Sequence, residues 1–335
     1  MRVLFSSYHN PSFWTITDYI ERTIMRLGHE LIPFDDRAFI IPGRLRKSVR
    51  FLQDIDLNRL NNRLISLASS TNPDLCLVAG GNRILPETVQ KIKSQGIKAV
   101  LWTIDAPRHF QPILAAVPDY DFIFCGGTEA QELLARARIK KTYWLPFACD
   151  PDIHKPADVN PEEKKKWGSD VSFIGSYYPN RAQALEKLAD FDLKVWGPGW
   201  NKLAHKSPLK KLTRDTQLKP KEWTKIFNSS PINIVIHFQD GETLCYQAAP
   251  RVYEVLACQG FLLVDDQRDV QSLFQDGKHL VIFKNTEDLR KKITYYLKQP
   301  EERKKIASQG YEETVHKHTY LHRLKEMFSV IEAGG

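Results

Sequence analysis

Short apolar runs alternate with amphipathic stretches along nearly the whole of this 335-residue chain. Near-continuous apolar runs that end in small or turn residues are typical of strands in a parallel sheet covered on both faces. Strands that alternate with helical patterns predict βα units and doubly wound α/β sheets. In the first half we expect strands at residues 2–7, 74–80, 98–104, 120–126 and 141–146, and helices at 15–27, 45–69, 86–95 and 128–136.

A proline-rich segment interrupts this pattern. Residues 146–170 carry prolines at positions 146, 151, 156 and 161, a spacing that disrupts both helices and ladders and predicts a linker. We therefore predict two Rossmann-like domains, residues 1–155 and 165–310, followed by a last segment, 311–335. The second half should have strands at 170–176, 192–199, 232–238, 260–266 and 279–284, and helices at 181–189, 220–228, 246–258, 286–297, 300–308 and 311–331.

Composition narrows the class of protein. Apolar residues make up 42% and charged residues 26% of the chain, and no apolar run reaches the roughly 18 residues of a membrane-spanning helix. The N-terminus lacks the apolar region of a signal peptide. Five cysteines without a CxxC spacing predict a reduced, cytoplasmic protein without structural zinc.

The net charge is +8, and the excess of basic residues is spread over several stretches of the sequence. Basic residues gather at 44–50, 162–168 and 205–214. Two interpretations stay open. These stretches are solvated surfaces, or they meet an anionic partner such as a phosphorylated ligand, an anionic membrane surface or nucleic acid.

The first strand of the second half ends in a candidate anion site. Gly175 and Ser176 follow the strand directly, and Arg181 lies at the start of the next helix. Backbone amides of a glycine turn and of a helix N-terminus bind anions, and the arginine adds positive charge for a diphosphate. A plain strand-to-helix turn is the alternative. The GxGxxG and GxxxxGK[ST] signatures are absent from the sequence, so dinucleotide and P-loop sites are not predicted.

The next strand ends in "KVWGPGW". Gly197 permits a close backbone approach, and Trp196 offers a flat face to a base. A structural turn explains the same residues equally well.

A charged pair stands at the start of a helix in "APRVYEVLACQG". Pro250 suits the first helical turn, and Glu254 is favoured near the positive end of the helix dipole. The positive charge of Arg251 is unfavourable at this end of the dipole, so its presence indicates a nearby anion. A carboxylate one turn later can accept two hydrogen bonds from a ribose diol. Arg251 on a diphosphate and Glu254 on a ribose would hold the two ends of a nucleotide.

These segments, with "DVSFIGSYYPNR", "LKVWGPGW" and the sequence from 273 to 324, resemble the C-terminal domain of GT-B glycosyltransferases, and most of all the CgeB-like, spore-maturation type. The first half resembles the family more loosely, through "VLWTIDAPRHF" and "WLPFACDPDIHKP". The resemblance implies two Rossmann-like domains that face each other across a cleft. The second domain binds the nucleotide, the first binds the acceptor, and the last helix crosses back to the first domain.

The resemblance also implies a function. The chain would move a sugar from a nucleotide-sugar, used as a co-substrate without a further cofactor, to a hydroxyl acceptor. That acceptor is a glycan, protein, nucleic acid or small molecule, and an anionic glycan, lipid surface or DNA is among the options. Donor-binding residues would be Gly175, Ser176, Arg181, Trp196, Gly197, Arg251 and Glu254. A nucleotide-sugar epimerase and a non-catalytic nucleotide-sugar-binding protein remain alternatives, and the oligomeric state stays open.

One position departs from the family pattern. Many retaining members carry a second glutamate eight residues before the ribose glutamate, and here that position is Tyr246. This leaves inversion or retention of stereochemistry open. For deprotonation of the acceptor, the candidates are Asp105 and His9, which follow strands of the first half. Asp105 could instead cap a turn, and His9 could simply be solvated. The sequence "DPD" at 150–152 indicates a turn of the linker, and no metal is predicted.

Overall fold

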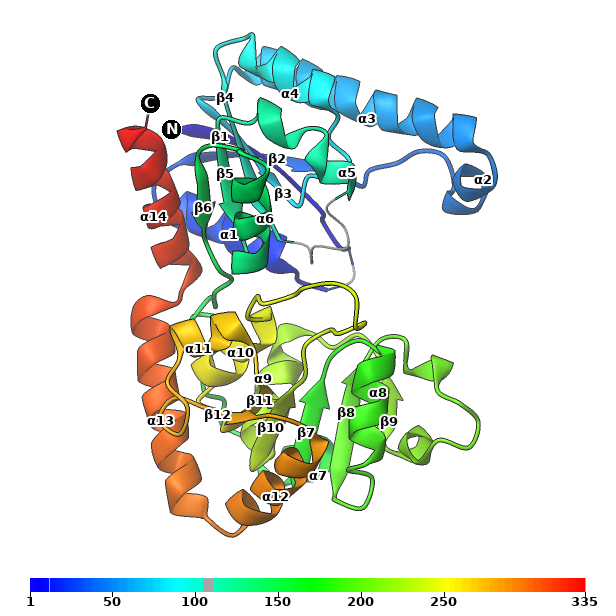
Figure 1. Ribbon diagram of the computed structural model, residues 1–335, viewed down its shortest axis with the longest axis vertical. Coiled ribbons are helices and arrows are strands. Elements are labelled where there is room, and N and C mark those ends of the chain that lie inside the picture. The colour runs from blue at the N-terminus through cyan, green and yellow to red at the C-terminus, as the bar shows by residue number, and fades with distance from the viewer. Residues whose placement is uncertain (12, 105–110, 335) are drawn as a thin grey trace. The chain divides into compact units, whose positions relative to one another are not determined.

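The computed structural model describes residues 1–11, 13–104 and 111–334, with the backbone alone at 47, 50, 111 and 112. The chain divides into two compact units (Figure 1). The first unit comprises Met1–Pro11, Thr15–Pro146 and Leu324–Gly335. The second unit comprises Ser12–Trp14 and Phe147–Arg323.

The first unit is built on a six-stranded sheet in the order β2-β1-β3-β4-β5-β6, with every neighbouring pair parallel. Its strands are β1 (Arg2–Ser7), β2 (Glu30–Asp35), β3 (Leu75–Ala79), β4 (Lys98–Thr103), β5 (Phe122–Cys125) and β6 (Thr142–Trp144). Its helices are α1 (Ile16–Arg26), α2 (Gly43–Ser48), α3 (Arg50–Thr71), α4 (Pro86–Lys93), α5 (Gln111–Leu114) and α6 (Thr128–Arg136).

The second unit contains another six-stranded parallel sheet, in the order β12-β11-β10-β7-β8-β9. Its strands are β7 (Val171–Ile174), β8 (Leu193–Gly197), β9 (Thr213–Asp215), β10 (Ile232–Val235), β11 (Leu262–Asp265) and β12 (Val281–Phe283). The helices that follow β6 are α7 (Pro161–Trp167), α8 (Pro179–Glu186), α9 (Pro220–Ser229), α10 (Pro250–Ala257), α11 (Arg268–Leu273), α12 (Thr286–Leu297), α13 (Pro300–Lys317) and α14 (Tyr320–Ala333).

The two predicted Rossmann-like sheets are both present, and the central strands explain why. Every residue of β3, β5, β7, β10 and β11 is buried. Strands covered by helices on both faces need apolar side chains at consecutive positions, which is the pattern visible in the sequence. Ten of the twelve strands in the described part of the chain were expected, and the apolar runs located them.

The two unexpected strands are β2 and β9, each at an edge of its sheet. β2 contains Pro33 and is only partly buried, and β9 has three residues of which two are exposed. An edge strand pairs on one side only and tolerates proline and polar residues, so it gives little apolar signal.

Helix boundaries also differ from expectation. The single helix expected at 45–69 is two helices, α2 and α3, because Val49 between them is extended. The helix that begins at Pro300 continues to Lys317, beyond the expected residue 308. The predicted linker contains α7, which Asn160 and Glu163 begin with reciprocal side-chain and backbone hydrogen bonds.

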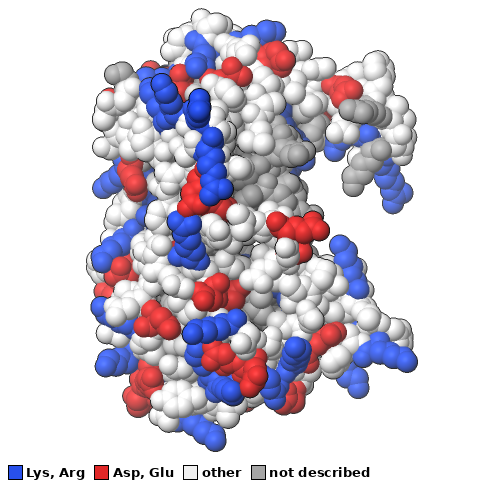
Figure 2. Space-filling model, viewed as in Figure 1, with Lys and Arg blue, Asp and Glu red and all other residues white. Residues whose placement is uncertain are grey.

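On the face shown in Figure 2, lysine and arginine side chains are interspersed with acidic ones over the whole surface. Within residues 1–11, 13–104 and 111–334, none of the helices combines the length and apolar character needed to cross a membrane.

Close packing between helices gives a test of the second unit. A Cβ added to Gly310 of α13 would lie 2.2 Å from the His279 carbonyl oxygen and 2.9 Å from Leu256 Cδ2. We expect Gly310→Ala to lower the free energy of unfolding by about 1–3 kcal/mol, although helix propensity alone favours alanine by up to about 1 kcal/mol. Denaturant titration measures the change, and a stabilised variant would contradict the packing. Gly43→Ala in α2 is the control, because nothing lies within 4 Å of its added Cβ.

Candidate functional site

The second sheet has a topological switch point between β7 and β10. These strands are neighbours, yet the chain proceeds from β7 toward β8 and β9 on one side and from β10 toward β11 and β12 on the other. In open α/β sheets, ligands bind beyond the carboxyl ends of the strands at such a point. The residues that follow β7, β10 and β11 are therefore the first candidates for a site.

Two glycines bring the loops after β7 and β8 together. Gly197 has φ +134°, and a Cβ there would lie 2.3 Å from the Gly175 carbonyl oxygen. The same carbonyl accepts a hydrogen bond of 2.9 Å from the Trp200 indole N–H. The approach of backbone to backbone requires a glycine at position 197, and a Cβ at Gly175 would lie 3.0 Å from the Phe173 ring, so packing alone accounts for both glycines.

Neighbouring candidates divide between surface and core. Ser176 is exposed directly after Gly175. Trp196 is only 7% exposed, and its ring lies 5.4 Å from that of Trp167. This packing argues against a contact between Trp196 and a base, while Ser176 is open to a ligand.

Arg181 lies beneath the loop after β7. Its Nε donates to the Ile236 carbonyl at 2.7 Å, and one terminal nitrogen donates to the Ser176 carbonyl at 3.0 Å. Burial lowers the pKa of Arg181 to about 10. The guanidinium thus joins the ends of β7 and β10 and places a positive charge below the loop.

A chain of buried hydrogen bonds joins β11, β10 and α10. His237, two residues after β10, holds its Nδ1 2.6 Å from the carboxylate of Asp265, the last residue of β11. His237 Nε2 accepts the Ala249 backbone N–H at 2.9 Å. A backbone N–H can only donate, so Nδ1 carries the imidazole hydrogen and donates to Asp265. The chain fixes the N-cap residue of α10 against the sheet.

Arg251 and Glu254 follow on the first turns of α10. An Arg251 terminal nitrogen lies 2.6 Å from a Glu254 carboxylate oxygen. The anion beside Arg251 is therefore Glu254 itself, a possibility that the sequence argument did not weigh. The guanidinium also lies 4.7 Å from the ring centroid of Trp223, a favourable cation–π distance. The Glu254 side chain is 8% exposed.

His154 lies on the side of the Glu254 carboxylate opposite Arg251. Its Nε2 lies 3.9 Å from the second carboxylate oxygen, and its ring is stacked 6.2 Å from that of Trp223. Burial lowers the pKa of His154. The Asp150 backbone N–H donates to His154 Nδ1, so residues 150–154 form a turn. Among the residues that the structure describes, no three His, Cys, Asp or Glu side chains are grouped for a metal ion.

Tyr246 occupies the position of the second family glutamate. Its backbone carbonyl accepts the N–H of Asp269 in α11 at 3.1 Å, and the Arg268 guanidinium lies 5.2 Å from its ring centroid. The loop before α10 is thereby attached to α11.

In the first unit the candidate base His9 has a carboxylate partner. His9 Nε2 lies 2.7 Å from a Glu21 oxygen, and this hydrogen bond raises the pKa of His9 above 6.5 against the opposing effect of burial. Asp105, the other candidate base, lies outside the described residues.

Sequence reasoning missed four residues of these arrangements: His154, His237, Asp265 and Glu21. His237 and Asp265 each follow or end an apolar strand run. Polar residues at the carboxyl ends of adjacent parallel strands are a usable signal. His154 and Glu21 carry no comparable signal. His154 lies in a turn of the linker and Glu21 on a helix, and only the tertiary structure places them beside their partners.

Comparisons with known proteins show which families and folds the chain resembles. Residues 181–329, which include β10, α10 and β11, match the family model described as glycosyl transferase-like. The chain is 23% identical over 261 residues to spore protein CgeB of Bacillus subtilis strain 168, covering 74% of this chain and 80% of CgeB. The predicted resemblance to CgeB-like glycosyltransferases is confirmed.

Solved structures share the fold. HepE from Anabaena, solved in complex with UDP and glucose, has a TM-score of 0.69 at 11% identity and covers 99% of this chain and 100% of that chain. Sucrose-phosphate synthase from Thermosynechococcus elongatus has a TM-score of 0.71 at 9% identity and covers 100% of both chains. An Escherichia coli structure bound with UDP-2-fluoro glucose has a TM-score of 0.66 at 12% identity and covers 98% of both. At these identities the likeness confirms the predicted GT-B fold class.

The pair of His9 and Glu21 gives a titration test. We expect His9 to titrate above pH 6.5 and its pKa to fall in Glu21→Gln, which removes the carboxylate. Because the folded-state pKa is raised, the pair stabilises the fold fully below pH 6.5, and this contribution is lost as pH rises through the folded-state value. NMR of the imidazole resonances measures both proteins. Equal midpoints would show that Glu21 does not govern His9.

Proposed function

We propose that this chain, a glycosyltransferase with the GT-B fold, transfers a sugar from a nucleoside diphosphate sugar to a hydroxyl acceptor. The observation that carries the proposal is the Arg251–Glu254 pair at the start of α10, inside the segment that matches the glycosyl transferase-like family. The structural neighbours solved with UDP or a UDP-sugar support a nucleotide-sugar as donor.

In this proposal the carboxyl edge of the second sheet holds the donor. Glu254 accepts hydrogen bonds from the ribose hydroxyls. Arg251, while paired with Glu254, also interacts electrostatically with the diphosphate. The loop at Gly175 and Ser176 supplies backbone amides, and Arg181 contributes a fixed positive charge from beneath it. The buried surroundings of Glu254 strengthen these interactions, because charges interact more strongly away from water.

Transfer requires one bond to form and one to break. The acceptor oxygen loses its proton and attacks the anomeric carbon, and the bond from that carbon to the diphosphate oxygen breaks with release of the nucleoside diphosphate. Arg251 and the loop amides would stabilise the charge on the leaving group. We propose Asp105 as the base in an inverting reaction, with His9 as the second candidate. A retaining reaction would use the leaving phosphate instead.

His9 is the weaker of the two candidates. The bond to Glu21 raises its pKa, so a larger fraction of His9 is protonated at neutral pH and unable to accept a proton. The acceptor itself is a hydroxyl compound, and an anionic glycan, a lipid or a nucleic acid would suit the positive net charge.

A thermal-shift screen with UDP-, GDP-, TDP- and CMP-sugars tests the donor class. A specific donor should stabilise the protein by about 2.7 kcal/mol at a hundredfold excess over its Kd. Nucleotide release with and without acceptors then separates the reaction types. Release that needs an acceptor indicates a transferase, and binding without release indicates a non-catalytic binder. The family match gives no support to an epimerase.

Glu254→Gln tests the ribose contact. Loss of a charged hydrogen bond costs on the order of 1.5–3 kcal/mol, so we expect UDP to bind about tenfold to hundredfold more weakly. Calorimetry measures the affinity, and a melting curve verifies the fold. Glu287→Gln, which makes the same change at an exposed position of α12, is the control. Unchanged affinity in a folded Glu254→Gln protein would exclude the ribose role.

Asp105→Asn tests the proposed base, since the amide keeps the shape and removes the charge. We expect turnover at saturating donor to fall by about a hundredfold or more, with donor affinity nearly unchanged. Single-turnover kinetics and donor calorimetry measure the two quantities separately. If donor affinity falls and turnover does not, Asp105 binds the donor or supports the fold.

A further inference from the structure

One end of the first unit exposes an unusual group of apolar side chains. Five large apolar residues between positions 40 and 55 are 43–69% exposed: Ile40, Leu45, Val49, Phe51 and Ile55. We call residues 40–55 the α2–α3 tip. The other exposed large apolar side chains of the described residues are scattered from Met1 to Tyr295. Apolar side chains exposed together generally mark a surface that another molecule covers.

The exposed side chains are arranged in pairs along each helix. Leu45 and Val49 are four residues apart on α2 and its C-cap, and Phe51 and Ile55 are four residues apart on α3. Within α3, residues with this spacing lie on the same side of the helix, whereas Val49 lies in the extended backbone that ends α2. Figure 1 shows that α3 extends away from the strands of the first unit, and that α2 and the start of α3 lie at its far end.

A buried carboxylate holds the α2–α3 tip in place. Asp56, only 3% exposed, accepts the backbone N–H groups of Ile40 and Ile41 at 3.2 Å each and lies 3.2 Å from an Arg46 terminal nitrogen. The Arg46 guanidinium also lies 3.7 Å from the centroid of the Phe39 ring. The exposure of the apolar side chains is therefore built into the fold, and it is not the fraying of a helix end.

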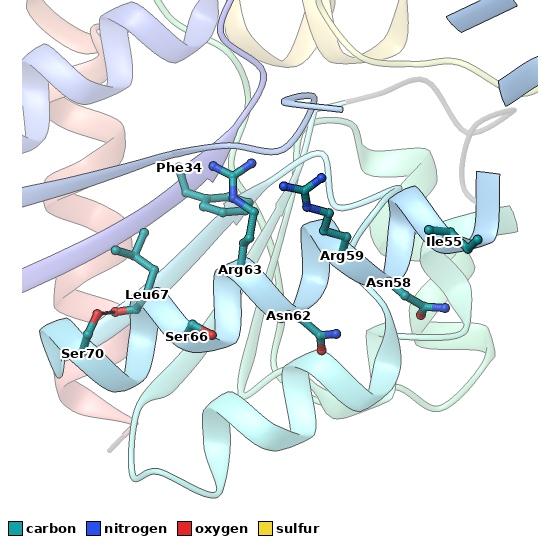
Figure 3. A pocket seen from close by; sticks show the side chains of 9 residues that line it. All are labelled: Phe34, Ile55, Asn58, Arg59, Asn62, Arg63, Ser66, Leu67 and Ser70. Atoms are coloured by element: carbon teal, nitrogen blue, oxygen red, sulfur yellow. Dashed lines mark hydrogen bonds between the residues drawn. The ribbon is translucent and has the colours of Figure 1, made fainter. Parts of the chain in front are cut away.

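The sequence of the α2–α3 tip is basic as well as apolar. The sequence places four basic residues among positions 44–50 and a single acidic residue, Asp54, in the α2–α3 tip. A groove along α3 begins at Ile55 and is lined further on by Arg59 and Arg63. Figure 3 shows both arginines pointing to the same side of α3, with Arg63 beside Phe34. Exposed Ile55 of the α2–α3 tip and the two arginines thus line one groove on α3.

We propose that the α2–α3 tip, with Arg59 and Arg63, docks the protein on an anionic phospholipid bilayer. The five apolar side chains would enter the boundary between headgroups and acyl chains, and the arginines would meet lipid phosphates. Interfacial binding depends on this combination of exposed apolar area and positive charge.

Other partners fit the surface less well. Nucleic acid would satisfy the basic residues but leave aliphatic side chains such as Ile40, Leu45 and Val49 in water, since only aromatic rings stack on bases. A second copy of the chain would cover the apolar side chains but bring like charges together. An anionic bilayer satisfies both properties.

Vesicle flotation of the full chain tests the proposal. The probe is phosphatidylcholine vesicles with about 30% phosphatidylglycerol, and the comparison is pure phosphatidylcholine. We expect binding to the anionic vesicles, at least about tenfold weaker binding to the neutral ones, and weakening of the anionic binding with salt. Absence of binding to anionic vesicles at low salt would overturn the proposal.

Two pairs of substitutions locate the surface. Leu45→Ser with Phe51→Ser should lower the partition coefficient on anionic vesicles by about tenfold or more, because burial of apolar area drives insertion. Met25→Ser with Leu133→Ser, at 54% and 44% exposure in the same unit, is the matched control and should bind as the wild type. A melting curve verifies both folds. Equal binding by the first pair would overturn the proposal.

The same proteins also test the rival partners. Light scattering of the wild type and of the Leu45→Ser, Phe51→Ser variant reports the oligomeric state without lipid. A wild-type dimer that becomes monomeric in the variant would identify a second copy as the occupant and overturn the proposal. Arg59→Ala with Arg63→Ala should weaken binding to anionic vesicles by about fivefold or more and leave binding to neutral ones unchanged. Unchanged anionic binding would exclude the two arginines from the surface.

Discussion

The hydrogen-bond chain Asp265–His237–Ala249 is the constraint on which the candidate site depends. It joins the carboxyl ends of two neighbouring strands to the N-cap residue of a helix. Buried polar groups are stable only when they are fully hydrogen-bonded, and here the histidine uses both ring nitrogens. The start of α10 therefore has one position relative to the sheet. Arg251 and Glu254 lie in the first and second turns of α10, so their positions follow from it.

The buried carboxylate of Glu254 would destabilise the fold if it had no polar neighbours. The carboxylate faces Arg251 on one side and His154 on the other, and Trp223 packs against both of these residues. Removing a carboxylate from water carries a large penalty, which an adjacent guanidinium offsets. Preorganised charges of this kind are what the binding of a phosphorylated ligand requires, because little reorganisation remains when the ligand arrives.

A buried carboxylate also holds a segment in place in the first unit, but that segment has different surroundings. Asp56 is buried and collects two backbone N–H groups and an arginine, and this fixes a loop whose neighbours are exposed apolar side chains. In both units a buried carboxylate accepts backbone or imidazole N–H groups and so orients the segment that follows. The segment in the second unit faces the carboxyl edge of a sheet, and the segment in the first unit, the α2–α3 tip, faces solvent.

The sequence by itself determined the class of fold. Consecutive apolar residues at the central strands can be buried only between two layers of helices, so two doubly wound sheets followed from the pattern. The edge strands β2 and β9 lacked that signal, because an edge strand is half solvated. Helix boundaries at Val49 and beyond residue 308 depended on local backbone conformation and packing rather than on periodicity.

For the candidate site, the sequence singled out Arg251 and Glu254, and only the tertiary structure decided which groups they contact. It paired them with each other, placed Trp196 against Trp167, and turned Arg181 toward backbone carbonyls. It also joined His237 to Asp265 across 28 residues of sequence. The physical reason is that periodicity reports which residues are buried, whereas hydrogen bonds and ion pairs depend on which buried residues meet, and strand order and loop closure determine that.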